Sequence, residues 1–282
     1  MKIGIIGYGF VGKAVSFGFS HPEVVQTIVD PRLKKPIKNA KDVDFAFIAV
    51  PTPFGDNGEI NSSIVEETAA WMLKNTEAIV ILKSTVTPDV IDQLMSLPGA
   101  KSRMVYNPEF LTEKAANEDF VNPELHVFGG KRTTTQAVAE LYHNYSSCKP
   151  CPIKFMTAKE ASFVKYGINS FLASKVLWFN QFFDCVENNG GKFNTVLNAM
   201  LSDPRIGSSH TSVPGFDGKR GYGGACFPKD TNAFYNFDKS FTVLRETISV
   251  NNAMRSVYEK DERELEQNVN YGNNSVYINQ NI

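Results

Sequence analysis

The 282-residue chain is long enough for one large or two modest domains. Its formal net charge of -1 provides no global field that favours nucleic acid or an anionic membrane surface. The longest apolar run, residues 45–50, is too short to span a bilayer, and the N-terminus lacks the pattern of a signal peptide. Four cysteines in a chain of this length do not indicate a disulfide scaffold, so we expect a cytoplasmic protein.

Up to about residue 130, short β-rich runs alternate with helical patterns. The predicted strands are residues 2–6, 27–29, 43–50, 78–82, 103–106 and 126–128, and the predicted helices are 10–19, 62–75, 88–97 and 133–142. This alternation predicts βαβ units and a parallel sheet covered on both faces, which is the doubly wound Rossmann-type α/β fold. Residues 31–42 are barely enough for a parallel crossover, so a helix there is short or absent.

After Pro152 the pattern becomes helical. Thr157 and Glu160 form a capping-box sequence that opens a long helix running to about Glu187, where 188–191 end it. Further helices are expected over 194–201, 229–236 and 243–266. We therefore predict an NAD-binding domain over 1–152, a long connecting helix with a small all-helical domain over 153–267, and a weakly structured tail over 268–282.

The long helix carries four aromatic residues, Phe163, Phe171, Trp178 and Phe182, which we expect to pack in the core. It also carries more apolar surface than one small domain is expected to cover, which predicts a homodimer.

The first strand leads into the sequence G-x-G-x-x-G, which then opens a helix. In this context the motif is typical of a dinucleotide-binding loop, with a pyrophosphate on the helix N-terminus. Asp30 ends the second strand, where a carboxylate binds the ribose 2′-hydroxyl and repels a 2′-phosphate, so NAD is favoured over NADP. Arg32, Lys34 and Lys35 follow closely and could partly offset that preference. The loop residues expected at the cofactor are Gly7, Tyr8, Gly9, Phe10, Val11 and Gly12.

Five later segments form a recognisable series along the chain. They are 50–53 (VPTP), 84–86 (STV), 107–113 (NPEFLTE), 165–169 (KYGIN) and 221–230 (GYGGACFPKD). With the glycine loop, they resemble the UDP-glucose/GDP-mannose dehydrogenase family from residue 1 to about 258. Members of this family oxidise the C6 alcohol of a nucleotide sugar to a carboxylate with two NAD and one water. The resemblance implies oxidation of UDP-glucose to UDP-glucuronate.

An oxidation from alcohol to acid has to hold the intermediate aldehyde between its two hydride transfers, and a cysteine nucleophile can do this. A thiolate holds the aldehyde as a thiohemiacetal, a second hydride transfer gives a thioester, and water hydrolyses it. Cys226 follows Gly223 and Gly224 and precedes Lys229, so backbone can approach it and a cation can favour its thiolate.

The resemblance assigns further roles. Lys165 and Asn169, which share one helix face, are expected to hold the C6 oxygen. Glu109 and Glu113 follow a strand and could move protons or order water, and Asp230 could bind the hydrolytic water. Contacts to the cofactor are expected from Pro51, Thr52, Thr85, Glu113 and Lys229, with Thr85 also near the catalytic water. Contacts to the substrate are expected from Phe110, Leu111, Glu113, Lys165, Asn169, Arg205, Tyr222 and Gly223.

The chain departs from the family pattern in several places. The pattern fades after residues 250–252, and the remaining residues are too few for the second Rossmann-like domain that binds UDP in the family, so we expect that domain to be missing. Thr112 stands where an arginine is common. Cys148 and Cys151 form a lone C-x-x-C without a second ligand pair, so we predict no metal site.

Other interpretations keep part of this pattern. GDP-mannose dehydrogenases share the NPEFL and cysteine segments, whereas N-acetylmannosamine dehydrogenases usually differ near the cysteine. A hydroxyacid dehydrogenase related to 6-phosphogluconate dehydrogenase would need no nucleophilic cysteine. A non-catalytic NAD-binding protein would need none of Thr85, Glu113, Lys165, Asn169, Cys226 and Asp230.

Overall fold

The computed structural model describes residues 1–55 and 58–272 and divides the chain into two compact units. Unit 1 comprises residues 1–52 and 61–165, and unit 2 comprises 53–60 and the chain from Tyr166 onward.

A seven-stranded sheet forms the centre of unit 1, in the order β2-β1-β3-β4-β5-β6-β7. The strands are β1 (Lys2–Ile6), β2 (Val25–Val29), β3 (Phe45–Ile48), β4 (Ile79–Leu82), β5 (Met104–Tyr106), β6 (His126–Gly129) and β7 (Ile153–Met156). All these strands pair in parallel except β5 and β6, which meet antiparallel at Tyr106 and Gly129. The strand order reverses between β2 and β3 on either side of β1, which is the point where open α/β sheets bind ligands.

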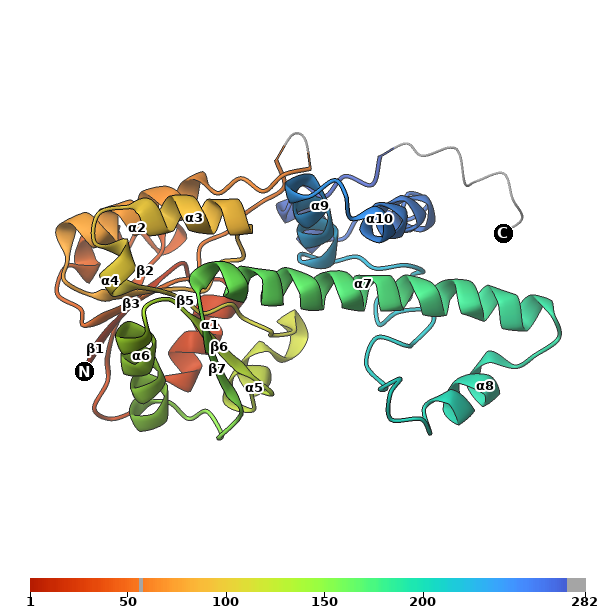
Figure 1. The fold of residues 1–282 in the computed structure, drawn as a ribbon, viewed down its shortest axis with the longest axis horizontal. Coiled ribbons are helices and arrows are strands. Elements are labelled where there is room, and N and C mark those ends of the chain that lie inside the picture. The colour runs from red at the N-terminus through yellow and green to blue at the C-terminus, as the bar shows by residue number, and fades with distance from the viewer. Residues whose placement is uncertain (56–57, 273–282) are drawn as a thin grey trace. The chain divides into compact units, whose positions relative to one another are not determined.

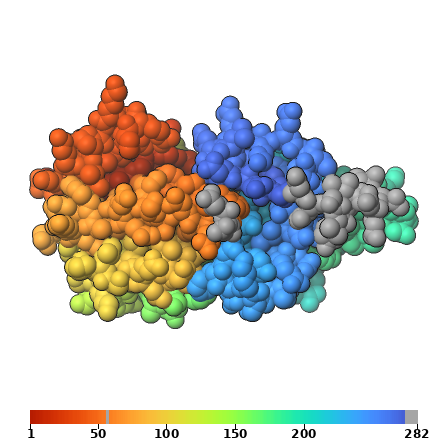
Figure 2. Space-filling view, turned by 90° about the horizontal axis from the view of Figure 1, so that it is seen from above, coloured from red at the N-terminus to blue at the C-terminus, as the bar shows by residue number. Residues whose placement is uncertain are grey.

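Helices cover both faces of this sheet, which confirms the doubly wound fold. Figures 1 and 2 show α2 and α3 side by side on one face, and α1, α5 and α6 lie on the other face in Figure 1. The helices are α1 (Phe10–Gly18), α2 (Ser63–Asn75), α3 (Pro88–Ser96), α4 (Ala100–Arg103), α5 (Ala116–Val121) and α6 (Arg132–Tyr145). The link after β2 holds only the 3-10 turns η1 (Pro31–Leu33) and η2 (Ile37–Ala40), as its short length predicts.

Aromatic side chains dominate the core between the sheet and the helices on the α1 face. Phe19 packs edge-on against Phe120 and Tyr142, and Phe47 of β3 lies 5.1 Å from Phe19 between ring centroids. Such edge-to-face contacts add about 0.5–1.5 kcal/mol per pair beyond the burial of area. Gly18 lets α5 approach α1, because a Cβ there would lie 2.1 Å from the Phe120 ring.

The predicted domain boundary at residue 152 does not coincide with the division between the units. The unpredicted strand β7 pairs with β6, and the first two turns of α7 (Ala158–Asn188) also pack on the sheet. A Cβ on Gly129 would lie 2.7 Å from Ala161, and the Ser162 hydroxyl donates to the Val86 carbonyl at 2.7 Å. Unit 1 therefore extends to Lys165, and α7 runs on into unit 2.

The start of α7 is fixed by the predicted capping box. The Thr157 amide donates to the Glu160 carboxylate at 2.8 Å, and the Glu160 amide donates to the Thr157 hydroxyl at 3.2 Å. This reciprocal pair satisfies two helix-terminal donors. In the described part of the chain, no helix combines the length and the apolar character needed to cross a membrane.

The aromatic residues of α7 do not all lie in the core, so that prediction is wrong for three of them. The exposed fractions are 42% for Phe163, 67% for Phe171 and 52% for Trp178. Phe182 stacks on Trp178 with ring centroids 4.8 Å apart. The helix therefore presents aromatic surface outward.

The rest of unit 2 is helical, with α8 (Phe193–Met200), α9 (Phe227–Phe237), α10 (Thr242–Arg255) and α11 (Glu262–Glu266). One predicted helix over 243–266 is thus two, because Asp261 starts α11 with its own capping box. Val269 and Tyr271 of the predicted tail are buried, so its first residues are packed; residues 273–282 lie outside those that the structure describes.

Candidate functional site

The glycine loop connects β1 to α1 and is shaped by close backbone approaches. Gly7 has φ +90°, and a Cβ there would lie 2.4 Å from the Ala49 carbonyl oxygen. A Cβ on Gly12 would lie 1.9 Å from the Gly7 carbonyl oxygen, so glycine is required at both positions. By contrast, a Cβ on Gly9 would meet no atom within 4 Å.

The start of α1 fits a pyrophosphate. Gly9 is its N-cap without a capping side chain, and its first turn, which includes Phe10 and Val11, holds no acidic residue. The amides of a helix's first turn have no partner within the helix and carry a partial positive charge, which suits an anionic group. The residues present therefore fit the phosphates of a dinucleotide.

Asp30 lies beside this loop and is buried. Its carboxylate accepts the Tyr8 amide at 2.8 Å and is bound by the amide and guanidinium of Arg32. The hydrogen bond from Arg32 lowers the pKa of Asp30 to about 2, with the Tyr8 amide adding to the shift, so the side chain is a carboxylate at neutral pH. The Asp30 carboxylate is thus paired with the Arg32 guanidinium.

Further predicted cofactor contacts follow neighbouring strands at the same edge of the sheet. Pro51 and Thr52 come after β3, and Thr85 comes after β4, which pairs in parallel with β3. Thr52 and Thr85 are buried, whereas Pro51 is exposed. The Ser84 hydroxyl donates to the Val50 carbonyl at 2.7 Å and ties the two loops together.

A buried ion pair joins the loop after β5 to α7. The Lys165 ammonium donates to the main-chain carbonyl of Glu109 at 2.6 Å and lies 3.3 Å from its carboxylate Oε1. The second carboxylate oxygen of Glu109 accepts the Leu111 amide at 2.7 Å. Phe110 lies under the Lys165 ammonium at 5.4 Å from ring centroid to nitrogen. Glu113, two residues beyond Leu111, is exposed.

Lys83, which was not among the residues expected from the sequence, lies near this pair. It directly follows β4, is 4% exposed, and donates to Asn107 Oδ1 at 3.0 Å. Asn107 also accepts the Tyr142 hydroxyl at 2.8 Å. Burial lowers the pKa of Lys83 to about 8, opposed by the charge of Glu109. A lysine directly after an apolar strand was the signal in the sequence that could have found it.

In unit 2, a second buried group surrounds Asp230. Asn169 of α7 donates to its Oδ2 at 2.6 Å, and the buried ammonium of Lys229 bonds to its Oδ1. The Asp230 amide donates to the Cys226 carbonyl at 2.8 Å in the first turn of α9. The charge of Lys229 is thus compensated by Asp230, whereas the sequence pattern predicted that Lys229 acts on the cofactor and on Cys226.

Cys226 is the N-cap of α9 and is partly buried. Within residues 1–55 and 58–272, none of the four cysteines is in a disulfide. An 11-residue helix begins directly after the sulfur-bearing residue, and its N-terminal partial charge favours a thiolate. This position was not expected from the sequence, where Lys229 was the expected source of positive charge.

The remaining predicted substrate residues differ in their surroundings. Tyr222 is buried, with its hydroxyl 3.3 Å from the Thr231 hydroxyl. Gly223 packs so closely that a Cβ would lie 2.1 Å from Arg255. Arg205 is exposed, and its guanidinium forms a bidentate pair with Asp203.

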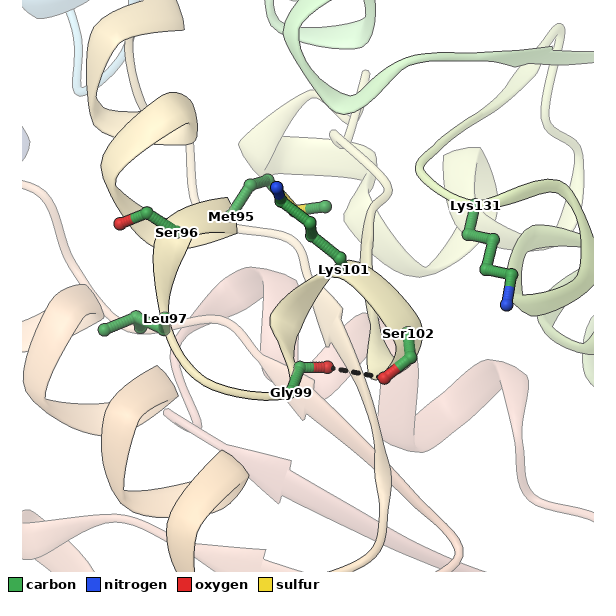
Figure 3. Close-up of a pocket in the computed structure, with 7 residues that line it drawn as sticks. All are labelled: Met95, Ser96, Leu97, Gly99, Lys101, Ser102 and Lys131. Carbon is green, nitrogen blue, oxygen red and sulfur yellow. Dashed lines mark hydrogen bonds between the residues drawn. The ribbon is translucent and has the colours of Figure 1, made fainter.

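A shallow hollow of about 430 Å³ lies at the opposite edge of the sheet, before β5 and after β6. Figure 3 shows Lys101 and Lys131 among its lining residues, with the Ser102 hydroxyl bonded to the Gly99 carbonyl. It lies away from the strand ends that carry Gly7, Thr52 and Thr85. Within residues 1–55 and 58–272, no cluster of His, Cys, Asp or Glu side chains has the arrangement of a metal site.

Comparison with known proteins decides the family. Residues 32–146 match the model of the NAD-binding domain of the UDP-glucose/GDP-mannose dehydrogenase family. Residues 159–260 match the model of its central domain. The chain belongs to this family. Its predicted Rossmann-type fold and its NAD-binding domain are therefore confirmed.

Relatives within the family include curated UDP-glucose 6-dehydrogenases. That of Rhizobium meliloti is 33% identical over 230 residues, which cover 75% of this chain and 50% of the relative. That of Bacillus subtilis is 32% identical over 233 residues, which cover 78% and 51%. A solved UDP-glucose dehydrogenase from Pyrobaculum islandicum aligns with a TM-score of 0.76 at 27% identity, covering 89% of this chain and 68% of that one. The chain thus spans about half the length of these curated relatives.

Proposed function

We propose that the protein oxidises the C6 alcohol of a nucleotide sugar, UDP-glucose, to the carboxylate with NAD. The observation that carries the proposal is the partly buried Cys226 at the N-terminus of α9, beside the buried Asn169–Asp230 pair. A thiol in this position is suited to covalent catalysis. The named activity of the curated relatives, at 33% and 32% identity, supports UDP-glucose over GDP-mannose.

The glycine loop and Asp30 hold the cofactor in this proposal. The open space at Gly9 and the uncapped start of α1 receive the pyrophosphate, and Asp30 accepts a ribose hydroxyl. Thr52 and Thr85 contribute hydroxyls at the same edge of the sheet, where Pro51 is an apolar contact. NAD, when bound, accepts the hydride in each of the two oxidations.

Lys165 and Asn169 hold the C6 oxygen in both oxidations. They are four residues apart on α7 and therefore share a helix face. A buried ammonium and an amide donor stabilise a developing oxyanion more strongly than water does, because the surroundings are apolar and the donors are already oriented. Glu109, which contacts Lys165, accepts the alcohol proton, and Glu113 orders water.

Cys226 carries the intermediate between the two oxidations. Its sulfur adds to the aldehyde carbon, and the carbonyl oxygen becomes the hydroxyl of a thiohemiacetal. Loss of a hydride and a proton gives a thioester. Water then cleaves the C–S bond, giving the carboxylate and the thiol, so the whole reaction consumes one water and two NAD and yields two NADH and three protons. Asp230 orders that water, and Lys229 and Asn169 hold Asp230 in place.

The substrate contacts in this proposal are Phe110, Leu111, Tyr222, Gly223 and Arg205. Arg205 is exposed, which is required of a residue that reaches a substrate held by a second copy, and it would have to leave Asp203 to do so. We further propose a homodimer that covers the exposed aromatic residues of α7, because exposed apolar patches of this kind mark interfaces.

NADH formation with a panel of substrates tests the proposal. UDP-glucose should support turnover, and GDP-mannose, UDP-N-acetylmannosamine and 6-phosphogluconate should support little. Preference for one of those three would assign the chain to the corresponding alternative. NAD binding without any turnover would favour a non-catalytic protein.

A further inference from the structure

The loop that precedes Cys226 is held by side chains from three other helices. The Gly221 amide donates to Asn180 Oδ1 of α7 at 3.1 Å. Asn251 of α10 accepts the Tyr222 amide at 2.7 Å and donates to the Tyr222 carbonyl at 3.0 Å. The Gly224 amide donates to Glu264 Oε1 of α11 at 3.3 Å. Because Cys226 lies two residues after Gly224, these bonds fix the backbone on which the sulfur is carried.

Glu264 is the most highly connected of these side chains. It is 1% exposed, and its Oε1 also accepts the Arg255 guanidinium and the Tyr271 hydroxyl, both at 2.6 Å. Its Oε2 accepts the Asp261 amide at 2.9 Å and completes the capping box of α11. A carboxylate with this many donors is held in one orientation, so its bond to Gly224 is directed as well.

Arg255 restricts the position of Gly223 by close contact. Its side chain is 1% exposed and is paired with Asp217 at 2.7 Å as well as with Glu264. A Cβ on Gly223 would lie 2.1 Å from Arg255 Nη2 and 2.3 Å from Glu264 Oε1. The loop therefore lies directly on the Arg255–Glu264 pair, and a Cβ at position 223 would displace the ends of both side chains.

Two of the residues around the loop, Glu264 and Tyr271, come after the part of the chain that matches the family model. The match to the central-domain model ends at residue 260, whereas Glu264 and Tyr271 come later. Both are buried in unit 2, so the segment 261–271 is part of the packing around the loop.

We propose that Glu264, oriented by Tyr271 and Arg255, is a positioning residue for the loop that carries Cys226. The functional consequence rests on the proposed function, but the positioning itself does not. Loss of the Glu264 bonds frees the Gly224 amide, two residues before Cys226, while Asn180 and Asn251 still hold Gly221 and Tyr222. The sulfur then samples orientations that do not favour addition to the aldehyde.

Hydrogen–deuterium exchange followed by mass spectrometry tests the positioning without turnover. Glu264→Gln weakens the charged contacts to Gly224 and Arg255, and Tyr271→Phe removes one hydroxyl at constant ring shape. In both variants the segment 221–226 should exchange faster, chiefly at the Gly224 amide. The expected effect is about tenfold for Glu264→Gln, because a charge-assisted hydrogen bond is replaced by a neutral one. Exchange in the sheet of unit 1 should not change. Unchanged exchange at 221–226 in both variants would overturn the proposal.

Matched controls separate a local effect from general destabilisation. Glu262→Gln changes an exposed carboxylate on the same helix, and Tyr235→Phe changes a tyrosine on α9. Neither should alter exchange at 221–226.

The rate at which iodoacetamide alkylates Cys226 is a second measurement, made by mass spectrometry on the peptide that contains Cys226. This rate should differ from that of wild type in Glu264→Gln and Tyr271→Phe, and it should equal that of wild type in the two controls. If UDP-glucose is turned over, kcat should fall while KM for NAD stays the same. If wild type shows no turnover but the exchange result holds, the proposed function fails and the positioning stands.

Discussion

The Lys165 ammonium is anchored to Glu109 twice, through the main-chain carbonyl at 2.6 Å and the carboxylate at 3.3 Å. The carbonyl holds the nitrogen in place whatever the protonation state of the carboxylate. Both side chains are almost fully buried, so the ammonium acts in surroundings of low polarity. A lysine held in this way is suited to stabilise an oxyanion.

Lys165→Met should therefore lower kcat for UDP-glucose oxidation by about 10²–10³, the usual effect of removing one oxyanion donor. Methionine keeps much of the apolar stem, and circular dichroism should show a folded protein. Lys159→Met is the matched control, because Lys159 is on the same helix but is exposed and paired with Asp92. A loss of less than about threefold in Lys165→Met would contradict the assignment.

Asp30 should decide the choice of cofactor. Asp30→Ala should weaken NAD binding and narrow the difference between NAD and NADP, because the carboxylate that binds one and repels the other is gone and Arg32 remains. Isothermal titration of wild type and variant measures both affinities, with Asp42→Ala, an exposed carboxylate, as the control. Equal affinity of the wild type for NAD and NADP would refute the assignment.

Lys83 should make stability depend on pH in a narrow alkaline window. Its pKa is about 8 in the folded protein and near 10.5 when unfolded, so between these values the unfolded chain binds more protons. The free energy of unfolding should therefore rise by about 3 kcal/mol as pH increases from 8 to 10.5.

Lys83→Met should abolish that rise and increase stability below pH 8, because Asn107 keeps its bond from Tyr142. Urea unfolding of both proteins across this range, with the exposed Lys101→Met as the control, gives the difference. If the free energy of unfolding varied with pH in the same way in wild type and Lys83→Met, Lys83 would not be the buried cation responsible for the rise.

The exposed aromatic residues of α7 should form the dimer contact. Phe171→Glu and Trp178→Glu each place a charge on the patch and should shift the protein toward monomer in sedimentation velocity. Val25→Glu, at an exposed apolar position on the sheet edge, should have no such effect. A wild-type monomer at micromolar concentration would contradict the homodimer.

Local sequence patterns predicted most of unit 1, since glycine spacing, capping and strand–helix alternation act over a few residues. The strand β7 was missed because Ile153–Met156 is short and partly exposed, so it has little hydrophobic signal. The division of the long C-terminal helix at Asp261 depends on one capping box within a continuous helical pattern.

The site residues could be proposed from motif resemblance, but their contacts could not. Glu109 and Lys165 are 56 residues apart, and Asn169 and Asp230 are 61 apart, so only folding brings each pair together. The buried Arg255–Glu264 pair likewise depends on tertiary packing, which sequence spacing does not report, whereas Lys229 and Asp230 are neighbours in the sequence.

The covalent role of Cys226 is the central claim, and intact-protein mass spectrometry tests it most directly. Cys226→Ser replaces the thioester by an ester that water hydrolyses less readily, so the variant incubated with UDP-glucose and NAD should accumulate a covalent sugar-nucleotide adduct or turn over very slowly. Wild type, assayed in parallel, should yield two NADH per sugar with no free aldehyde. A ratio of one NADH per sugar, with free aldehyde and no adduct on Cys226→Ser, would contradict the account.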